Sequence, residues 1–185
     1  MILTTKRLML REFEEEDWRT VLAYQSHPLY LRYNPWKHRT EPDVRAFVQM
    51  FLVQREEEPR TKFQLAITLA PGGQLIGNAG IRMRTPDAWE ADIGYELDPR
   101  YWGCGYATEA AHAILAFGFQ ELGLHRVWAW CIAENSASVR VLEKIGMRQE
   151  GRLREHERMK DRWWDTLVYA ILEHEWQTRP SSRSL

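Results

Sequence analysis

Cysteine, net charge and long apolar runs are all scarce in this sequence, and each shortage argues against a class of protein. The 185 residues include two cysteines, Cys104 and Cys131, whose spacing matches neither a redox pair nor a zinc motif. The formal net charge is −1, so the chain as a whole has no field that would attract nucleic acid or an anionic membrane. No group of histidine, cysteine and carboxylate residues has the spacing of metal ligands, and no metal site is predicted.

Membrane spans and targeting segments are missing as well. No uninterrupted apolar run approaches the roughly 18 residues that a membrane-spanning helix needs. The first residues become charged at Lys6 and Arg7, too early for the core of a signal peptide. We therefore expect a cytoplasmic protein with neither a nucleic-acid nor a membrane partner. The length suits one domain over residues 1–176, and the polar segment 177–185 is expected to be a disordered tail.

What the sequence does contain is a succession of strand and helix signals. Thr40 can cap a helix with Pro42 in its first turn, and Gly146 is placed to end a short helix in a left-handed conformation. Residues 27–40, with two prolines, are expected to form an irregular loop. The predicted strands are residues 7–13, 62–69, 74–83, 91–97, 126–133, 147–154 and 162–172. The predicted helices follow the acidic segment 14–17, Thr40, Gly105 and Asn135 or Ser136.

This order of elements predicts an α/β fold with a mixed sheet. Three strands between residues 62 and 97 are joined by short turns, which favours antiparallel pairing among them. A helix precedes the strand at residues 126–133 and another follows it, whereas the last two strands are joined by a charged turn. The regular strand–helix alternation of a doubly wound nucleotide-binding fold is absent.

The segment DPRYWGCGYATEA, Asp98 to Ala110, places Gly103 and Gly105 between a strand and a helix that starts near Tyr106. Unpaired backbone N–H groups and the helix dipole make such a helix start attractive to an anion such as a pyrophosphate. An empty tight turn would have the same sequence. A dinucleotide-binding loop is excluded because no third glycine follows, and a Walker A loop is excluded because Gly-Lys-Ser/Thr is missing.

Four motifs in order give the chain a family resemblance. They are LTTKRLMLR, ADIGYELDPRYWGCGYATEA, ENSASVRVLEKIGM, and EGRLRE followed by DTLVYAILEHEW. From about residue 3 to residue 176 the chain resembles the GCN5-related N-acetyltransferases (GNAT), most closely the ribosomal-protein-alanine N-acetyltransferase branch. The resemblance implies a mixed, mostly antiparallel sheet of six to seven strands with helices on both faces. It also implies that the fourth and fifth strands splay apart and that acetyl-coenzyme A (acetyl-CoA) lies between them.

The resemblance assigns residues to the cofactor. Backbone N–H groups of the loop and of the helix start would hold the pyrophosphate, and Trp102 stands where the family usually has a polar residue. The backbone of the strand ending at Tyr95 and Leu97 would bond the pantetheine arm. Asn135 would bond that arm from the other side, although a helix cap alone would also explain this residue. The residues implied for the loop are Trp102, Gly103, Cys104, Gly105, Tyr106, Ala107 and Thr108.

The implied chemistry is direct attack of a primary amine on the acetyl thioester. The family's tyrosine acid is absent, because Leu142 precedes Glu143-Lys144, and the position used by the ribosomal branch falls on Ser138. The base implied by alignment is Glu157. An α-amine with a pKa of about 7.7–8.0 is already partly neutral near pH 7.5, so a modest base suffices. Glu155, His156 and Asp92 are the alternatives for that base.

The acceptor is expected to be an α-amine of a protein N-terminus or of a small molecule. The resemblance also implies a homodimer. A second interpretation stays open: a catalytically silent sensor or scaffold that binds CoA with the same fold. A protein-interaction domain without a cofactor is a third.

Overall fold

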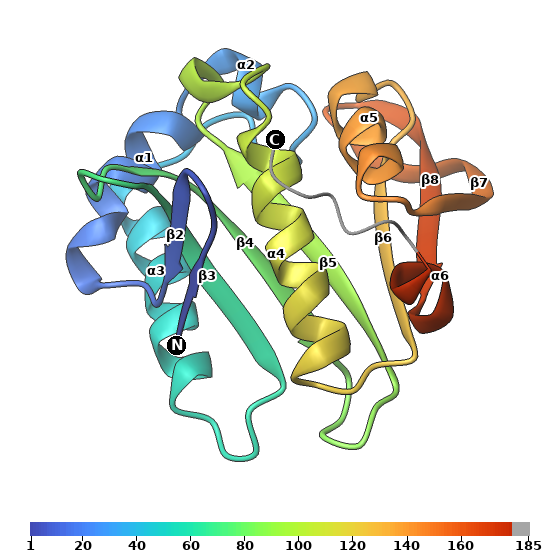
Figure 1. Ribbon diagram of the computed structural model, residues 1–185. Helices are drawn as coiled ribbons and strands as arrows, with labels where there is room; N and C mark the ends of the chain where they lie inside the picture. Colours follow the sequence, from blue (N-terminus) through green and yellow to red (C-terminus); the bar gives the residue numbers. More distant parts are fainter. Residues whose placement is uncertain (179–185) are drawn as a thin grey trace.

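The computed structural model describes residues 1–178; the rest of the predicted tail, 179–185, lies outside the described residues. One sheet of eight strands runs through the molecule in the order β1-β2-β3-β4-β5-β6-β8-β7 (Figure 1). Every neighbouring pair is antiparallel except β5 and β6. The strands are β1 (Ile2–Thr4), β2 (Leu8–Arg11), β3 (Lys62–Leu69), β4 (Leu75–Met83), β5 (Glu90–Leu97), β6 (Arg126–Ile132), β7 (Arg148–Met159) and β8 (Arg162–Leu172).

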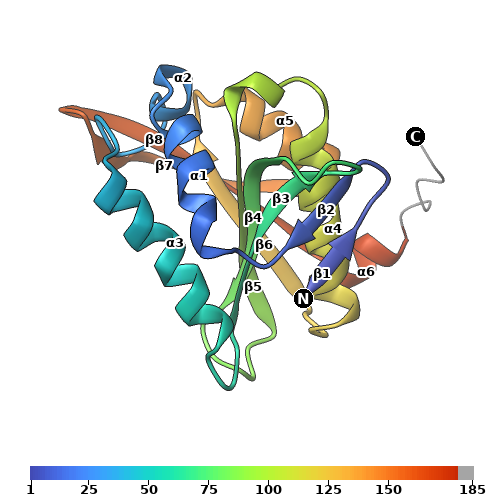
Figure 2. The same ribbon diagram turned by 90° about the vertical axis from the view of Figure 1, so that its left-hand side faces the viewer.

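Helices cover both faces of the sheet, as the side view shows (Figure 2). One face packs on α1 (Trp18–Gln25), α2 (Pro28–Leu31) and α3 (Glu41–Arg55). The other face packs on α4 (Tyr106–Gln120) and α5 (Ser136–Lys144), and this side holds the larger apolar core. A final short helix, α6 (Glu173–Gln177), follows β8. Within residues 1–178, no helix is long and apolar enough to cross a membrane.

Most predicted elements are confirmed, and the differences have physical reasons. The sheet has eight strands instead of six to seven because β1, only three residues long, adds to the edge of β2. The expected irregular loop contains α2, which His27 caps by accepting a hydrogen bond from the Leu29 N–H. The predicted strand 147–154 extends to Met159 as β7, with irregular register between Leu153 and Glu157. Gln177, expected in the tail, ends α6.

The cap of α3 forms as predicted. Thr40 accepts from the Asp43 N–H at 3.4 Å, and the Asp43 carboxylate accepts from the Thr40 N–H at 2.9 Å, which completes a capping box. We expect Thr40→Ala to lower the free energy of unfolding by about 1 kcal/mol, because the Asp43 N–H loses the Thr40 hydroxyl as its acceptor and the Asp43 carboxylate loses the hydrogen bond from that hydroxyl. Urea unfolding measures the loss. Thr40→Ser, which keeps the hydroxyl, should stay near wild type; an equal loss in both variants would contradict the cap.

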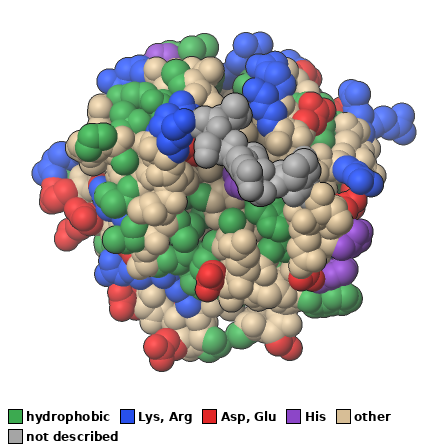
Figure 3. Space-filling model, in the orientation of Figure 1, with side chains coloured by type: hydrophobic (Ala, Val, Ile, Leu, Met, Phe, Trp, Pro, Cys, Tyr) green, Lys and Arg blue, Asp and Glu red, His purple; other side chains and the backbone are tan. Residues whose placement is uncertain are grey.

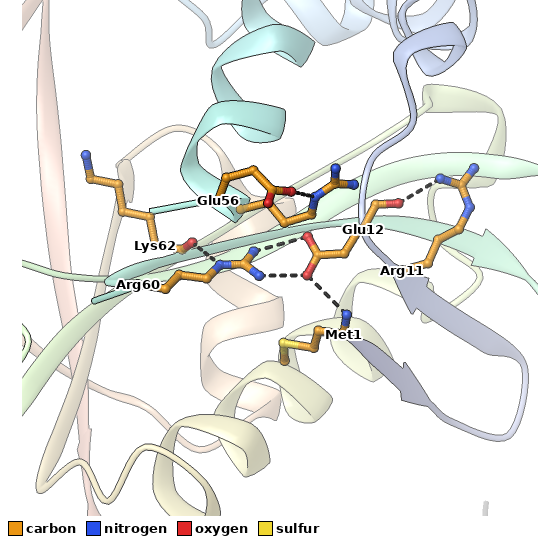
Figure 4. A network of polar contacts seen from close by, with 7 residues as sticks. Met1, Arg11, Glu12, Glu56, Arg60 and Lys62 are labelled. Atoms are coloured by element: carbon orange, nitrogen blue, oxygen red, sulfur yellow. Dashed lines mark hydrogen bonds and ion pairs between the residues drawn. The ribbon is translucent and has the colours of Figure 1, made fainter. Parts of the chain in front are cut away.

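A polar network fixes the edge of the sheet near the N-terminus (Figure 4). Glu12, just after β2, accepts two hydrogen bonds from Arg60, at 2.8 and 3.1 Å, and lies 3.4 Å from the Met1 ammonium. Arg60 also donates to the Lys62 carbonyl at the start of β3. These partly buried contacts tie the start of β1 and the end of β2 to the start of β3.

The sheet splits between β5 and β6. These strands pair in parallel only where Glu90, Ala91 and Asp92 face Arg126, Val127 and Trp128. Beyond Asp92 they diverge, while β5 continues on β4 and β6 continues on β8. The predicted splay between the fourth and fifth strands of the sequence analysis is therefore confirmed.

Candidate active site

A cleft of about 390 Å³ opens where β5 and β6 diverge. Its walls come from the end of β5, the loop before α4, the start of α4, β6, α5 and α2. Several Lys and Arg side chains lie in the upper part of the face seen in Figure 3. Of the predicted site residues, Cys104 and Glu157 are not among those lining the cleft. The lining includes Tyr95, Leu97, Trp102, Gly103, Gly105, Tyr106, Ala107, Thr108, Asn135 and Ser138.

The glycine loop has the backbone geometry of an anion site. Gly103 and Gly105 have φ values of 77° and 82°, in the region that favours glycine. Gly105 is the N-cap of α4, and the first bond of that helix runs from the Glu109 N–H to the Gly105 carbonyl. The N–H groups of the preceding helical residues therefore lack intrahelical partners. Space around Gly103 is open, since no atom of the described part of the chain lies within 4 Å of where a Cβ would be, so a phosphate can approach the backbone.

Some backbone N–H and C=O groups at the end of β5 face the gap between β5 and β6. Asp98 donates its N–H to the Ile76 carbonyl of β4 at 2.8 Å, and Leu97 lies opposite Gly77. Bonding to β4 alternates along an antiparallel pair, so Tyr95 and Leu97 direct their backbone groups away from β4. Pairing with β6 has ended by then, which leaves these groups facing the cleft. They suit the amide groups of a pantetheine arm.

Trp102 uses its indole within the chain. Its Nε1–H donates to the Leu97 carbonyl at 2.9 Å, so this carbonyl already has one partner. The Leu97 N–H and both backbone groups of Tyr95 are not engaged by that bond. Trp102 thus fixes the end of β5, where the family's polar residue would instead reach toward phosphate.

Ser138 lies in the first turn of α5, on the same side of the sheet as α4. Asn135 caps this helix, since its Oδ1 accepts from the Ser138 N–H at 3.2 Å. The Ser138 hydroxyl is 3.0 Å from the Tyr95 hydroxyl, which also donates to the Ser138 carbonyl. Burial raises the pKa of Tyr95, so its phenol stays protonated at neutral pH. The helix-cap role of Asn135 is therefore present, and its amide N–H groups are not used by that cap.

Cys131 lies in the wall of the cleft, and burial raises the pKa of its thiol to about 11. Only about a thousandth of it is thiolate at pH 8. We expect iodoacetamide at pH 8 to alkylate the exposed Cys104 and to spare Cys131, with labelling of Cys131 accelerating as the pH rises toward 11. Peptide mass spectrometry against time measures both rates. Faster labelling of Cys131 than of Cys104 at pH 8 would contradict this environment.

Glu96, which the sequence analysis did not single out, occupies the opposite side of β5. Its Oε1 accepts from the Tyr24 hydroxyl at 2.7 Å, the Gln25 amide at 2.9 Å and the Asn78 amide at 2.6 Å. Its Oε2 accepts from the Tyr30 hydroxyl at 2.5 Å. Burial, and then the charge of Glu96, raises the pKa of Tyr24 and Tyr30, so both phenols keep their protons and donate.

The hydrogen bonds within residues 1–178 leave one acceptor position of the Glu96 carboxylate unfilled. A carboxylate has about four acceptor sites, two on each oxygen, and Oε1 already serves three donors. Within residues 1–178, Oε2 accepts only from Tyr30 and can accept one more donor. Because Glu96 lines the cleft, that donor can be an amine or a water molecule. No local spacing reveals this site, since its partners lie 18 to 72 residues away in the sequence.

The other carboxylates considered for the base lie elsewhere. Glu157 is on β7 opposite Trp164, with its Oε1 at 3.6 Å from His156 Nδ1. Asp92 is paired with Arg82, which donates to it from Nε at 2.8 Å. Glu155 is in the irregular part of β7 and donates its N–H to Asp165. Glu157 stays a prediction, outside the set of residues that line the cleft.

Similarity to known proteins in sequence and structure identifies the family of this chain. The family model described as acetyltransferase (GNAT) domain matches residues 7–148. The chain is 41% identical over 176 residues to the uncharacterized N-acetyltransferase YnaD of Bacillus subtilis, covering 95% of this chain and 99% of that protein. A GNAT-family acetyltransferase from Bacillus anthracis has 36% identity and a TM-score of 0.83, covering 95% of this chain and 100% of that one.

The chain belongs to the GNAT family of acetyltransferases and is an acetyl-CoA-dependent acetyltransferase. The fold is shared more widely. RimL, a ribosomal L7/L12 alpha-N-protein acetyltransferase solved in complex with coenzyme A, superposes with a TM-score of 0.82 at 19% identity, covering 95% of this chain and 99% of that one.

Proposed function

We propose that this protein transfers the acetyl group of acetyl-CoA to a primary amine by direct attack in a ternary complex. One observation carries the proposal: adjacent residues of β5 face opposite sides of the sheet beside the split. Tyr95 meets Ser138 on the side of α5, and Glu96 meets Tyr24 and Tyr30 on the side of α1. A cofactor on the first side and an amine on the second would meet in the cleft between β5 and β6.

The residues around the cleft suit acetyl-CoA. The loop before α4, with Gly103 and Gly105, would hold the pyrophosphate through backbone N–H groups, and Tyr95 and Leu97 would bond the pantetheine arm. Arg140 and Lys144 of α5 add positive charge to the wall near the cofactor's phosphates. When bound, acetyl-CoA supplies the thioester carbonyl that the amine attacks.

Glu96 is the residue we assign to the amine. Its open Oε2 position would bind the ammonium group and then hold the proton that the amine loses. An α-amine is partly neutral near pH 7.5, so a modest base suffices. The polar network around Glu96 would keep the carboxylate in one orientation.

Ser138 is the residue we assign to the departing thiolate. Its hydroxyl lies 3.0 Å from the oxygen of the Tyr95 phenol, which holds the serine side chain in place. A thiol with a pKa near 8.5 leaves without strong acid assistance, so a serine hydroxyl is sufficient. Glu157, which the family resemblance implies as the base, is the alternative to Glu96.

The cleft also favours a particular kind of amine. Among the described residues that line it, Glu96 is the one acid, and the two bases, Arg140 and Lys144, both belong to α5. The walls on the acceptor side are largely aromatic and apolar. We therefore propose a monoamine on an apolar or aromatic carbon skeleton, either a small molecule or the α-amine of a protein N-terminus. These walls include Leu29, Tyr30, Tyr33, Trp130 and Ile132.

Thiol release from acetyl-CoA tests this function with four acceptors. Phenethylamine and a peptide with an N-terminal methionine represent the two sources of an apolar amine. Spermidine carries further positive charges and phenylalanine carries a carboxylate. The described residues of the cleft include neither a second acid nor a base on the acceptor side. We expect at least one of the first two to have the highest kcat/KM, with intersecting double-reciprocal plots. No thiol release with any amine, despite CoA binding, would favour the silent sensor instead.

Two further expectations follow from the resemblance. A homodimer would show twice the chain mass of 22.0 kDa in light scattering, and a monomer at all concentrations would exclude it. A cytoplasmic location fits the use of acetyl-CoA, and cell fractionation tests it.

A further inference from the structure

The N-terminal motif has no part in the function described so far, yet it contacts the cofactor loop. Thr5 and Arg7 lie in the turn between β1 and β2, about a hundred residues from Glu109 in the first turn of α4. The Glu109 Oε1 accepts from the Thr5 hydroxyl at 2.6 Å and from the Arg7 N–H at 2.9 Å. Its Oε2 accepts from Arg7 Nε at 2.7 Å and pairs with the Arg7 Nη2 at 2.7 Å.

The same arginine reaches the loop itself. Its Nη1 donates to the Cys104 carbonyl at 3.0 Å, and its guanidinium lies 4.5 Å from the centre of the Tyr106 ring. A Cβ at Gly105 would lie 3.4 Å from Nη2, so the guanidinium packs directly behind that glycine. Arg7 is not among the residues lining the cleft, and it therefore supports the loop from behind.

The contact between Arg7 and Glu109 also offsets a negative charge at the start of α4. Glu109 places a carboxylate in the first turn of α4, where it would repel a phosphate group bound to the same helix start. Burial alone would raise the pKa of Glu109, but the hydrogen bonds from Thr5 and Arg7 lower it, so the carboxylate is ionised at neutral pH. An ionised Glu109 needs the neighbouring guanidinium if this helix start is to attract an anion.

We propose that Arg7 is a positioning residue for the phosphates of CoA: it fixes the loop from Gly103 to Tyr106 and cancels the charge of Glu109. The inference rests on the proposed cofactor site and goes beyond it, because Arg7 lies outside the cleft. It also accounts for Trp102, whose indole is bonded to Leu97 and adds no charge to the loop.

Calorimetric titration of the full chain with CoA and with pantetheine tests the proposal. Pantetheine lacks the pyrophosphate and the nucleotide. In Arg7→Met we expect the Kd for CoA to rise about tenfold, the effect of a lost charge at a helix start together with a loosened loop, and the Kd for pantetheine to stay unchanged. In Arg7→Met with Glu109→Gln, part of the CoA affinity should return, because no unpaired carboxylate remains. Arg45→Met, which removes an exposed pair with Glu41 on α3, is the matched control.

The outcomes separate the proposal from a merely structural role. Equal weakening of CoA and pantetheine in Arg7→Met, or unchanged CoA binding, would overturn it. Arg7→Lys keeps the charge but loses the two-pronged contact, so an intermediate Kd for CoA is expected even if the methionine variant fails to fold. A wild-type chain that binds no CoA would instead refute the proposed cofactor site, and binding without turnover would leave the role of Arg7 standing.

Discussion

Replacing Glu96 by glutamine is expected to lower kcat/KM for amine acetylation by about 100-fold at pH 7. Glutamine has nearly the same shape, but its amide cannot take the proton that the amine must lose, and general base catalysis contributes about 10²–10⁴-fold. The proposed CoA site lies on the other side of β5, so the Kd for CoA should be unchanged. Initial rates of thiol release give the first quantity and calorimetry the second.

The matched control for this prediction is Glu157→Gln, which removes the carboxylate implied by the family resemblance. We expect kcat/KM for amine acetylation to change by less than about threefold in this variant, since Glu157 does not line the cleft. The deficit of Glu96→Gln should shrink as the pH rises through the amine pKa, because the amine then arrives already neutral. A large loss in Glu157→Gln with near-normal rates in Glu96→Gln would reverse the assignment.

The second large expected effect is a loss of folding stability when the contact between β4 and β5 is disturbed. Gly77 of β4 lies opposite Leu97, and a Cβ there would come within 2.1 Å of the Glu96 carbonyl and 2.9 Å of the Leu97 Cα. Backbone atoms cannot move aside as a flexible side chain can, so β4 and β5 would have to separate. We expect Gly77→Ala to lower the free energy of unfolding by about 3 kcal/mol, at the upper end for overpacking.

Urea unfolding measures that loss, and Gly151→Ala on β7 is the matched control. Among residues 1–178, no atom lies within 4 Å of where a Cβ at Gly151 would be, so this variant should stay within about 0.5 kcal/mol of wild type. Gly77→Ala should also reduce acetylation beyond the effect of unfolding, because Glu96 and Leu97 would shift together. Wild-type stability in Gly77→Ala would show that β4 and β5 do not approach as closely as described.

Local signals in the sequence were sufficient for most of the fold. Thr40 caps α3, Gly146 has the positive φ of 89° expected at a helix end, and the Pro-Gly-Gly segment joins β3 to β4. Each of these signals acts within a few residues. Strand β1 and helix α2 were missed because three- and four-residue elements have too few positions to show periodicity.

The candidate site could be predicted only where it depends on local backbone. The loop at Gly103 and Gly105, and the cap at Asn135, follow from motifs whose residues are close in the sequence. Glu96 could not be found in that way, because four side chains from α1, α2 and β4 define its environment. The position of Glu157 in space could not be predicted by counting residues from Gly151 either. Strand β7 has register shifts on both sides of Gly151 to Leu153, and each shift changes the direction of the side chains that follow. An alternating strand such as β5 does predict that Tyr95 and Glu96 face opposite sides.

A crystal structure with CoA and phenethylamine tests the central claim most directly. We predict that the pantetheine arm lies between β5 and β6, bonded to the backbone of Tyr95, and that the pyrophosphate contacts the N–H groups between Gly103 and Thr108. The amine should lie within hydrogen-bond distance of Glu96 Oε2. A cofactor bound outside this split, or an amine that contacts Glu157 instead of Glu96, would contradict the account.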